Sequence, residues 1–205
     1  MIVVACNTAS SVALVSLRAK FDIPVIGVIE PGALAAVAHS RQTVGVIGTA
    51  STIRSGAYTR AIQRLNPNLQ IIDQACPLLV PLVEEDWPHN RVVDEILATY
   101  FEIYRHNQPD ALILGCTHYP YLKPAIQKAM GAEVHLIDSG EETATAVRQV
   151  LTDMQLLNRE SGDPGKHKFY VSDFPQKFEE TASRFLGKPL ENLFKVELEV
   201  LESYK

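Results

Sequence analysis

The chain has 205 residues, of which 46% are hydrophobic and 21% charged, a composition typical of a globular protein with a sizeable core. Its formal net charge of −5 disfavours nucleic acid and anionic membranes as main partners. No apolar run reaches the ~18 residues of a membrane span. Because no basic leader precedes the first apolar run and only three cysteines are present, we expect a cytoplasmic protein with reduced thiols.

Strand-like and helix-like segments alternate along the chain, which predicts an α/β protein. Most of the strand-like segments are continuous apolar runs, as expected where helices cover both faces of a parallel sheet. The expected strands are residues 2–5, 25–29, 43–48, 70–75, 111–115, 134–138, 168–171 and 194–198. The expected helices are residues 10–20, 32–39, 51–65, 91–106, 122–130, 141–157 and 174–186.

Two turn-like segments mark the expected domain boundaries. Pro31 and Gly32 follow one strand, and Ser139 and Gly140 follow another. We therefore expect residues 31–139 to form one compact α/β domain. Residues 1–30 together with 140–205 would form the other.

Cys6 and Cys116 end two apolar segments that resemble each other, IVVACNTAS from Ile2 and LILGCTHYP from Leu112. Each cysteine is expected at the carboxyl end of a strand, where open α/β sheets bind their ligands. The first turn of the following helix favours a thiolate there. The two segments therefore suggest two thiols that face each other across a substrate.

A single cysteine at a strand end is more often a small buried hydrophobic residue. Cys76 fits that interpretation, because Pro77 and Leu78 follow it in place of small polar donors. The other two cysteines are followed by side chains that can donate hydrogen bonds to a bound anion. These are Asn7, Thr8, Thr117 and His118.

Four motifs, in order, resemble those of bacterial glutamate racemases, within the aspartate/glutamate racemase superfamily. They are ACNTA around Cys6, GVIGTASTI from Gly45, CPLLVPLVEE from Cys76 and LGCTHYP around Cys116. The similarity runs from Met1 to about the last strand. It implies two pseudo-symmetric parallel-sheet domains with helices on both faces.

The resemblance also implies an isomerase that interconverts L- and D-glutamate without a cofactor or metal and supplies D-glutamate for peptidoglycan synthesis. One cysteine thiolate removes the α-proton from one face, and the other thiol returns a proton to the opposite face. The implied catalytic residues are Cys6, Cys116, His118 and Glu84. The implied contacts to glutamate come from Asn7, Thr8, Thr49, Thr52, Thr117 and His118.

Simpler interpretations exist for three of these side chains. Thr49 can cap the helix that follows it, since threonine is favoured at helix starts. Glu84 and Glu85 can form a solvated surface pair. A lone histidine is usually structural, but His118 lies inside a motif.

The chain departs from the racemase pattern before Cys6. Family members carry an Asp-Ser-Gly strand and a Pro-Tyr-Gly motif upstream of the first cysteine, and neither is found here. The difference amounts to two strand–helix units, on the order of 60 residues. We therefore expect an incomplete first domain, from truncation or a misassigned start, and an impaired Cys6 half. The uncovered strand 2–5 and the resemblance both favour a homodimer.

Three alternatives remain open from the sequence. One is a racemase for another acidic amino acid such as aspartate. Another is a glutamate-binding remnant without turnover. The third is a thiol redox or metal protein, which the absence of a Cys-x-x-Cys pair and of zinc-ligand spacing disfavours.

Overall fold

The computed structural model of the chain describes residues 1–158, 167–173 and 175–197. The chain divides into two compact units, Met1–Leu157 and Asn158–Lys205. The grouping of residues 1–30 with 140–205 in one domain, which extends over both units, stays a prediction. Among the described residues, no helix has both the length and the apolar character needed to cross a membrane.

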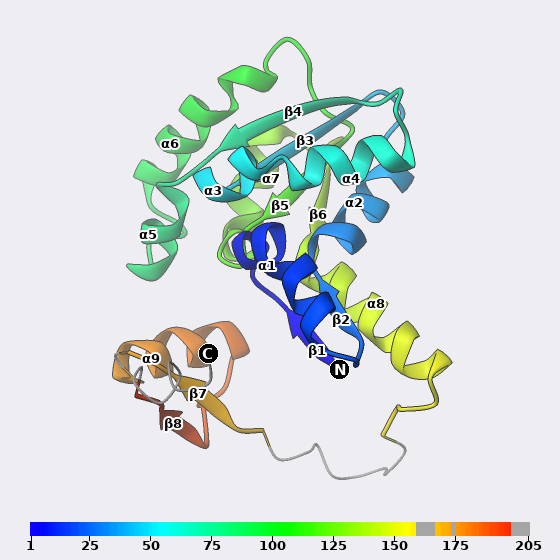
Figure 1. Cartoon of the computed structure of the whole chain (residues 1–205). Helices are drawn as coiled ribbons and strands as arrows, with labels where there is room; N and C mark the ends of the chain where they lie inside the picture. The colour runs from blue at the N-terminus through cyan, green and yellow to red at the C-terminus, as the bar shows by residue number, and fades with distance from the viewer. Residues whose placement is uncertain (159–166, 174, 198–205) are drawn as a thin grey trace. The chain divides into compact units, whose positions relative to one another are not determined.

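A four-stranded parallel sheet forms the centre of the first unit (Figure 1). Its strands, in spatial order, are β4 (Gln70–Ala75), β3 (Thr43–Gly48), β5 (Ala111–Gly115) and β6 (His135–Asp138). Every residue of β3 and β5 is buried. These two strands are continuous apolar runs because helices cover the sheet on both faces.

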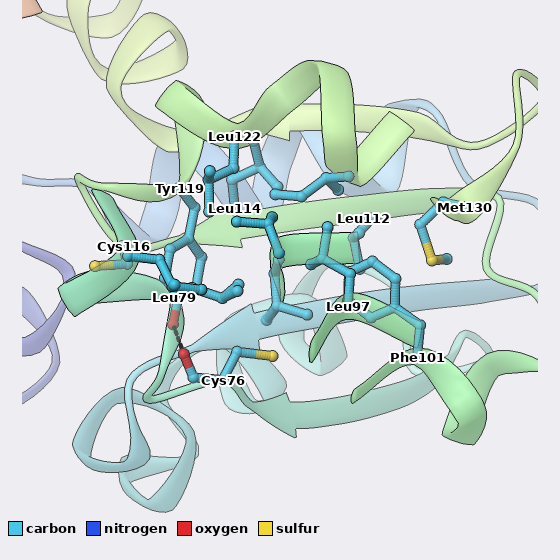
Figure 2. Packing of buried hydrophobic residues seen from close by; sticks show 14 of the residues in the cluster. Cys76, Leu79, Leu97, Phe101, Leu112, Leu114, Cys116, Tyr119, Leu122 and Met130 are labelled. Atoms are coloured by element: carbon cyan, nitrogen blue, oxygen red, sulfur yellow. Dashed lines mark hydrogen bonds between the residues drawn. The ribbon is translucent and has the colours of Figure 1, made fainter. Parts of the chain in front are cut away.

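Each face of this sheet has its own hydrophobic core. One core is formed with α5 (Leu79–Glu84), α6 (Arg91–Phe101) and α7 (Lys123–Met130). Figure 2 shows this core, with leucines from α5, α6 and β5 packed together. The other core is formed with α2 (Ile29–Ala38) and α4 (Ala57–Leu65). Helix α8 (Ser139–Asp153) contacts α2 and the β5 and β6 strands.

Two smaller parallel pairs complete the described strands. In the first unit, β1 (Ile2–Val4) pairs with β2 (Val25–Gly27), and α1 (Asn7–Lys20) connects them. In the second unit, β7 (Phe169–Val171) pairs with β8 (Leu193–Lys195), and α9 (Pro175–Leu186) connects them. The expected α/β class, with parallel sheets and helices on both faces of the main sheet, is confirmed.

The expected elements differ from the observed ones in a few places. The helix expected at 51–65 is two helices, α3 (Ala50–Ser55) and α4, because Gly56 between them has a left-handed φ of 60°. Helix α5 was not expected, since Pro81 interrupts a short apolar run. Proline is tolerated there because the first turn of a helix does not use its amide N–H groups. The expected end residues Phe174 and Leu198 lie outside the described residues.

Two further segments are 3-10 helices. The helix expected to reach residue 106 ends at Phe101 and continues as the 3-10 helix Glu102–Tyr104. The other 3-10 helix, Tyr119–Leu122, follows the Cys116 turn and leads into α7.

Candidate active site

Cys6 lies at the turn between β1 and α1, as the sequence predicts. It is the N-cap residue of α1, and its side chain is exposed. Its carbonyl oxygen accepts the first hydrogen bond of the helix, from the Ser10 amide at 2.8 Å. The amide N–H groups that begin α1 therefore lie beside the thiol, where they favour negative charge.

Cys116 follows the last residue of β5 directly, in the middle of the main sheet. Its residue is 7% exposed, and its sulfur points away from the labelled leucines at the edge of the core (Figure 2). The expected α-helix start after it is a turn followed by the 3-10 helix Tyr119–Leu122. The buried strand therefore fixes the position of the thiol, and the sulfur points away from the core.

Burial raises the pKa of the Cys116 thiol, and a hydrogen bond with the His118 backbone opposes this rise. Negative charge on Cys6 raises the same pKa further, whereas hydrogen bonds with Thr117 lower it. The two thiols therefore interact electrostatically, and ionisation of one disfavours ionisation of the other. An interaction of this kind disfavours the state in which both sulfurs are thiolates.

His118 connects Cys116 to a carboxylate. Its Nδ1 lies 3.7 Å from the Cys116 Sγ, and its Nε2 lies 3.3 Å from the Glu84 Oε1 at the end of α5. A carboxylate accepts only, so Nε2 carries the proton that it donates to Glu84. Nδ1 is then left facing the sulfur, where it can take up or return the thiol proton.

Three threonine hydroxyls meet between α1 and α3. Thr8 lies 2.9 Å from Thr49 and 3.1 Å from Thr52, and these last two hydroxyls are 3.0 Å apart. Thr49 also caps α3 by accepting a hydrogen bond from the Thr52 amide. Thr49 therefore caps α3 and also belongs to the cluster of three threonine hydroxyls. These hydroxyls are donors suited to a carboxylate.

Thr117 lies apart from this cluster, and its exposed hydroxyl is 3.4 Å from the His118 Nδ1. That hydroxyl is thus placed beside the same nitrogen that faces the Cys116 sulfur. A hydrogen bond between the two groups would orient the imidazole ring.

Asn7 is 2% exposed, and its side chain is engaged within the protein. Its Oδ1 accepts a hydrogen bond from the Tyr58 hydroxyl at 2.6 Å, and its Nδ2 donates to the Ser139 Oγ at 3.2 Å. Ser139 in turn donates to the Leu114 carbonyl oxygen at 3.1 Å. The Asn7 amide is therefore held in place from both of its polar atoms.

Sequence reasoning did not identify Tyr58 or Ser139 as part of this region. Tyr58 lies in an ordinary helical run with no motif. The sequence predicts only a domain boundary at Ser139. The available signal was the position of Ser139 directly after a strand, at the same sheet edge as Cys116.

Cys76 is more deeply enclosed than the other two cysteines. It is fully buried, and burial raises the pKa of its thiol to about 12. Its carbonyl oxygen accepts a hydrogen bond from the Tyr119 hydroxyl at 2.8 Å (Figure 2). This environment matches the structural role expected from Pro77 and Leu78. In the described part of the chain, no three His, Cys, Asp or Glu side chains group as metal ligands do.

Comparison with known proteins places this chain in a family. Residues 1–147 match the Asp/Glu/Hydantoin racemase family. A glutamate racemase from Geobacter metallireducens is 49% identical over 200 residues, covering 97% of this chain and 74% of that relative. A glutamate racemase from Lactiplantibacillus plantarum is 44% identical over 190 residues, covering 92% of this chain and 70% of the relative.

Solved structures give the same result. A glutamate racemase from Bacillus anthracis has a TM-score of 0.90 at 38% identity, covering 96% of this chain and 73% of that one. The Francisella tularensis glutamate racemase in complex with D-glutamate has a TM-score of 0.89 at 34% identity, with coverage of 97% and 74%. An aspartate racemase from Picrophilus torridus, at 21% identity and a TM-score of 0.52, shares the fold. The chain therefore belongs to the Asp/Glu/Hydantoin racemase family, among the glutamate racemases.

Proposed function

We propose that this chain interconverts L- and D-glutamate without a cofactor, using Cys6 and Cys116 as two bases on opposite faces of the substrate. The observation that carries the proposal is the position of Cys6 at the start of α1 and of Cys116 at the end of β5, with His118 between the Cys116 sulfur and the Glu84 carboxylate. The names of the relatives, and the relative solved with D-glutamate, support glutamate as the substrate.

The proton balance follows from the two thiols. In one direction the Cys116 thiolate removes the α-proton and becomes a thiol, leaving a carbanion-like centre. The Cys6 thiol then donates its proton to the opposite face and becomes a thiolate. The enantiomer leaves with the protonation states of the two sulfurs exchanged, and the reverse direction restores them. Each sulfur must lie ~3–3.5 Å from the reacting atoms in this arrangement.

The carbanion-like centre needs donors that stabilise developing negative charge. The hydroxyls of Thr8, Thr49 and Thr52 converge and can hold a carboxylate of the substrate. Asn7 and the amides that begin α1 lie beside Cys6. A carboxylate held by these groups would present the α-carbon between the two thiols.

Exchange of the α-proton in heavy water, followed by NMR for L- and for D-glutamate, tests the proposal. Exchange with inversion from both enantiomers supports the proposal, and loss of inversion by at least ~100-fold in Cys6→Ser and in Cys116→Ser assigns the reaction to the two thiols. The matched control is Cys76→Ala, which removes the structural thiol and should keep the activity. Wild-type protein that exchanges neither enantiomer would refute the proposed activity.

Two alternatives from the sequence have distinct outcomes. A glutamate-binding protein without turnover would bind glutamate and exchange nothing. A racemase for aspartate would exchange aspartate faster than glutamate. The matches named glutamate racemase, at up to 49% identity, favour glutamate over aspartate. A cytoplasmic location, a homodimer and the supply of D-glutamate for peptidoglycan stay predictions from the sequence.

A further inference from the structure

One buried side chain touches both thiol-bearing turns. The Tyr58 hydroxyl donates to the Oδ1 of Asn7, the residue that follows Cys6, at 2.6 Å. The Tyr58 ring lies against Gly115, the residue that precedes Cys116, since a Cβ built on that glycine would be 3.3 Å from the ring carbon Cε2. Tyr58 therefore extends from one turn to the other.

The chemistry of Tyr58 makes its hydroxyl a reliable donor. The residue is 2% exposed, and desolvation raises the pKa of its hydroxyl above the ordinary value for tyrosine. The hydroxyl thus stays protonated, and its bond to Oδ1 determines which way the Asn7 amide faces. The Nδ2 group is then directed to Ser139, which donates to the Leu114 carbonyl on β5.

Asn7 is consequently connected to β5 by two routes. One runs through Ser139 to the carbonyl of Leu114, and the other runs through the Tyr58 ring to Gly115. Gly32 on α2 leaves the space for this arrangement, since a Cβ there would lie 3.2 Å from the Tyr58 hydroxyl oxygen. Tyr58 is therefore enclosed by Asn7, Gly115 and Gly32.

The two thiols differ in how firmly their strands are held. The β5 strand before Cys116 has ladder partners on both sides, β3 and β6. The β1 strand before Cys6 pairs with β2 alone among the described strands. The Cys6 turn thus depends more on side-chain contacts for its position relative to Cys116.

We propose that Tyr58 is a positioning residue that holds the Cys6 turn at a fixed distance from the Cys116 end of β5. This proposal rests on the proposed function, because the distance between the sulfurs matters for a two-base reaction. A displacement of about 1 Å can reduce the rate of such a reaction by about 100-fold.

The substitution Tyr58→Phe keeps the ring against Gly115 and removes the hydroxyl that orients Asn7. We expect kcat to fall about tenfold, with KM changed less than about threefold, because the sulfurs are displaced while the threonine cluster remains. The matched control is Tyr104→Phe. Tyr104 is also 2% exposed, and its hydroxyl donates to the Ile72 carbonyl at 3.2 Å, away from both thiols.

Each variant loses the hydrogen bond of a buried tyrosine hydroxyl, so both should lower the thermal midpoint. Only Tyr58→Phe should lower kcat. If Tyr58→Phe and Tyr104→Phe have the same kcat, Tyr58 is an ordinary core residue and the proposal is wrong.

A second measurement does not depend on catalysis. In a Cys76→Ala background, bis-methanethiosulfonate reagents of graded length can bridge Cys6 and Cys116, and mass spectrometry gives the bridged fraction. We expect one preferred reagent length with Tyr58 present and a broader range in Tyr58→Phe, with Tyr104→Phe unchanged. An unchanged length preference in Tyr58→Phe overturns the positioning role, even if the wild-type chain proves inactive and the proposed function fails.

Discussion

Cys116 and Cys6 lie in two different environments, and different groups lie beside each sulfur. Cys116 is nearly buried, with an imidazole nitrogen 3.7 Å from its sulfur. Cys6 is exposed at the start of a long helix. Burial disfavours the Cys116 thiolate, and hydrogen bonds with the His118 backbone and with Thr117 oppose this effect.

The pH dependence of the reaction follows from the raised pKa of Cys116. A thiol with a raised pKa is less ionised at neutral pH, so kcat/KM in the direction that Cys116 begins should rise as the pH rises. Glu84→Gln removes the carboxylate that lies 3.3 Å from the His118 Nε2. We expect it to lower kcat/KM about tenfold and to move the acidic limb of the pH profile to higher pH.

The control for this variant is Glu85→Gln, one residue further along the chain at an exposed position. It should leave the pH profile of kcat/KM unchanged. If Glu84→Gln and Glu85→Gln have the same profile, the two glutamates form only the solvated pair considered from the sequence.

At the scale of elements, β3 and β5 leave little space at two of their glycines. A Cβ on Gly115 would lie 2.6 Å from the Ile47 carbonyl oxygen, which belongs to the backbone of β3. A Cβ on Gly45 would lie 2.7 Å from Cδ1 of Leu112, the end of a side chain that can turn away. The two glycines thus have similar crowding but different neighbours.

We therefore expect Gly115→Ala to lower the free energy of unfolding by about 3 kcal/mol and Gly45→Ala by about 1 kcal/mol. Backbone in a central strand shifts only if the ladder shifts with it, whereas a leucine changes rotamer. Urea denaturation of both variants measures the difference. An equal or larger loss in Gly45→Ala would show that the β3–β5 spacing adjusts more easily than this geometry implies.

At the scale of the whole molecule, substrate binding and folding are linked. A ligand that binds only the folded chain should raise the free energy of unfolding by about 2.7 kcal/mol at 100 times its Kd. D-glutamate should therefore raise the thermal midpoint of the wild-type chain, and of Cys6→Ser as well, because that change leaves the threonine cluster intact.

The substitution Thr8→Val should shift this response to higher D-glutamate concentrations, because it removes the hydroxyl that contacts both Thr49 and Thr52. Thr145→Val, at an exposed position on α8, is the control and should respond like the wild type. A thermal response in the wild type without proton exchange in heavy water would identify a binding protein that lacks turnover.

Much of the fold and the main site residues could be predicted from local patterns. The strands 43–48 and 111–115 were located because buried parallel strands are continuous apolar runs. The positions of Cys6 and Cys116 at strand ends follow from the same runs. Helix α5 and the break at Gly56 were missed, because a short helix with a proline and a single left-handed residue leave weak signals in a sequence.

The features that required the tertiary structure are those that join distant parts of the chain. Asn7 is separated from Tyr58 by 51 positions and from Ser139 by 132. The raised pKa of Cys116 depends on burial beneath helices from other segments. Composition and periodicity report how a segment is packed, so they place thiols at the ends of strands. Which side chains meet those thiols depends on how the strands and helices come together in three dimensions.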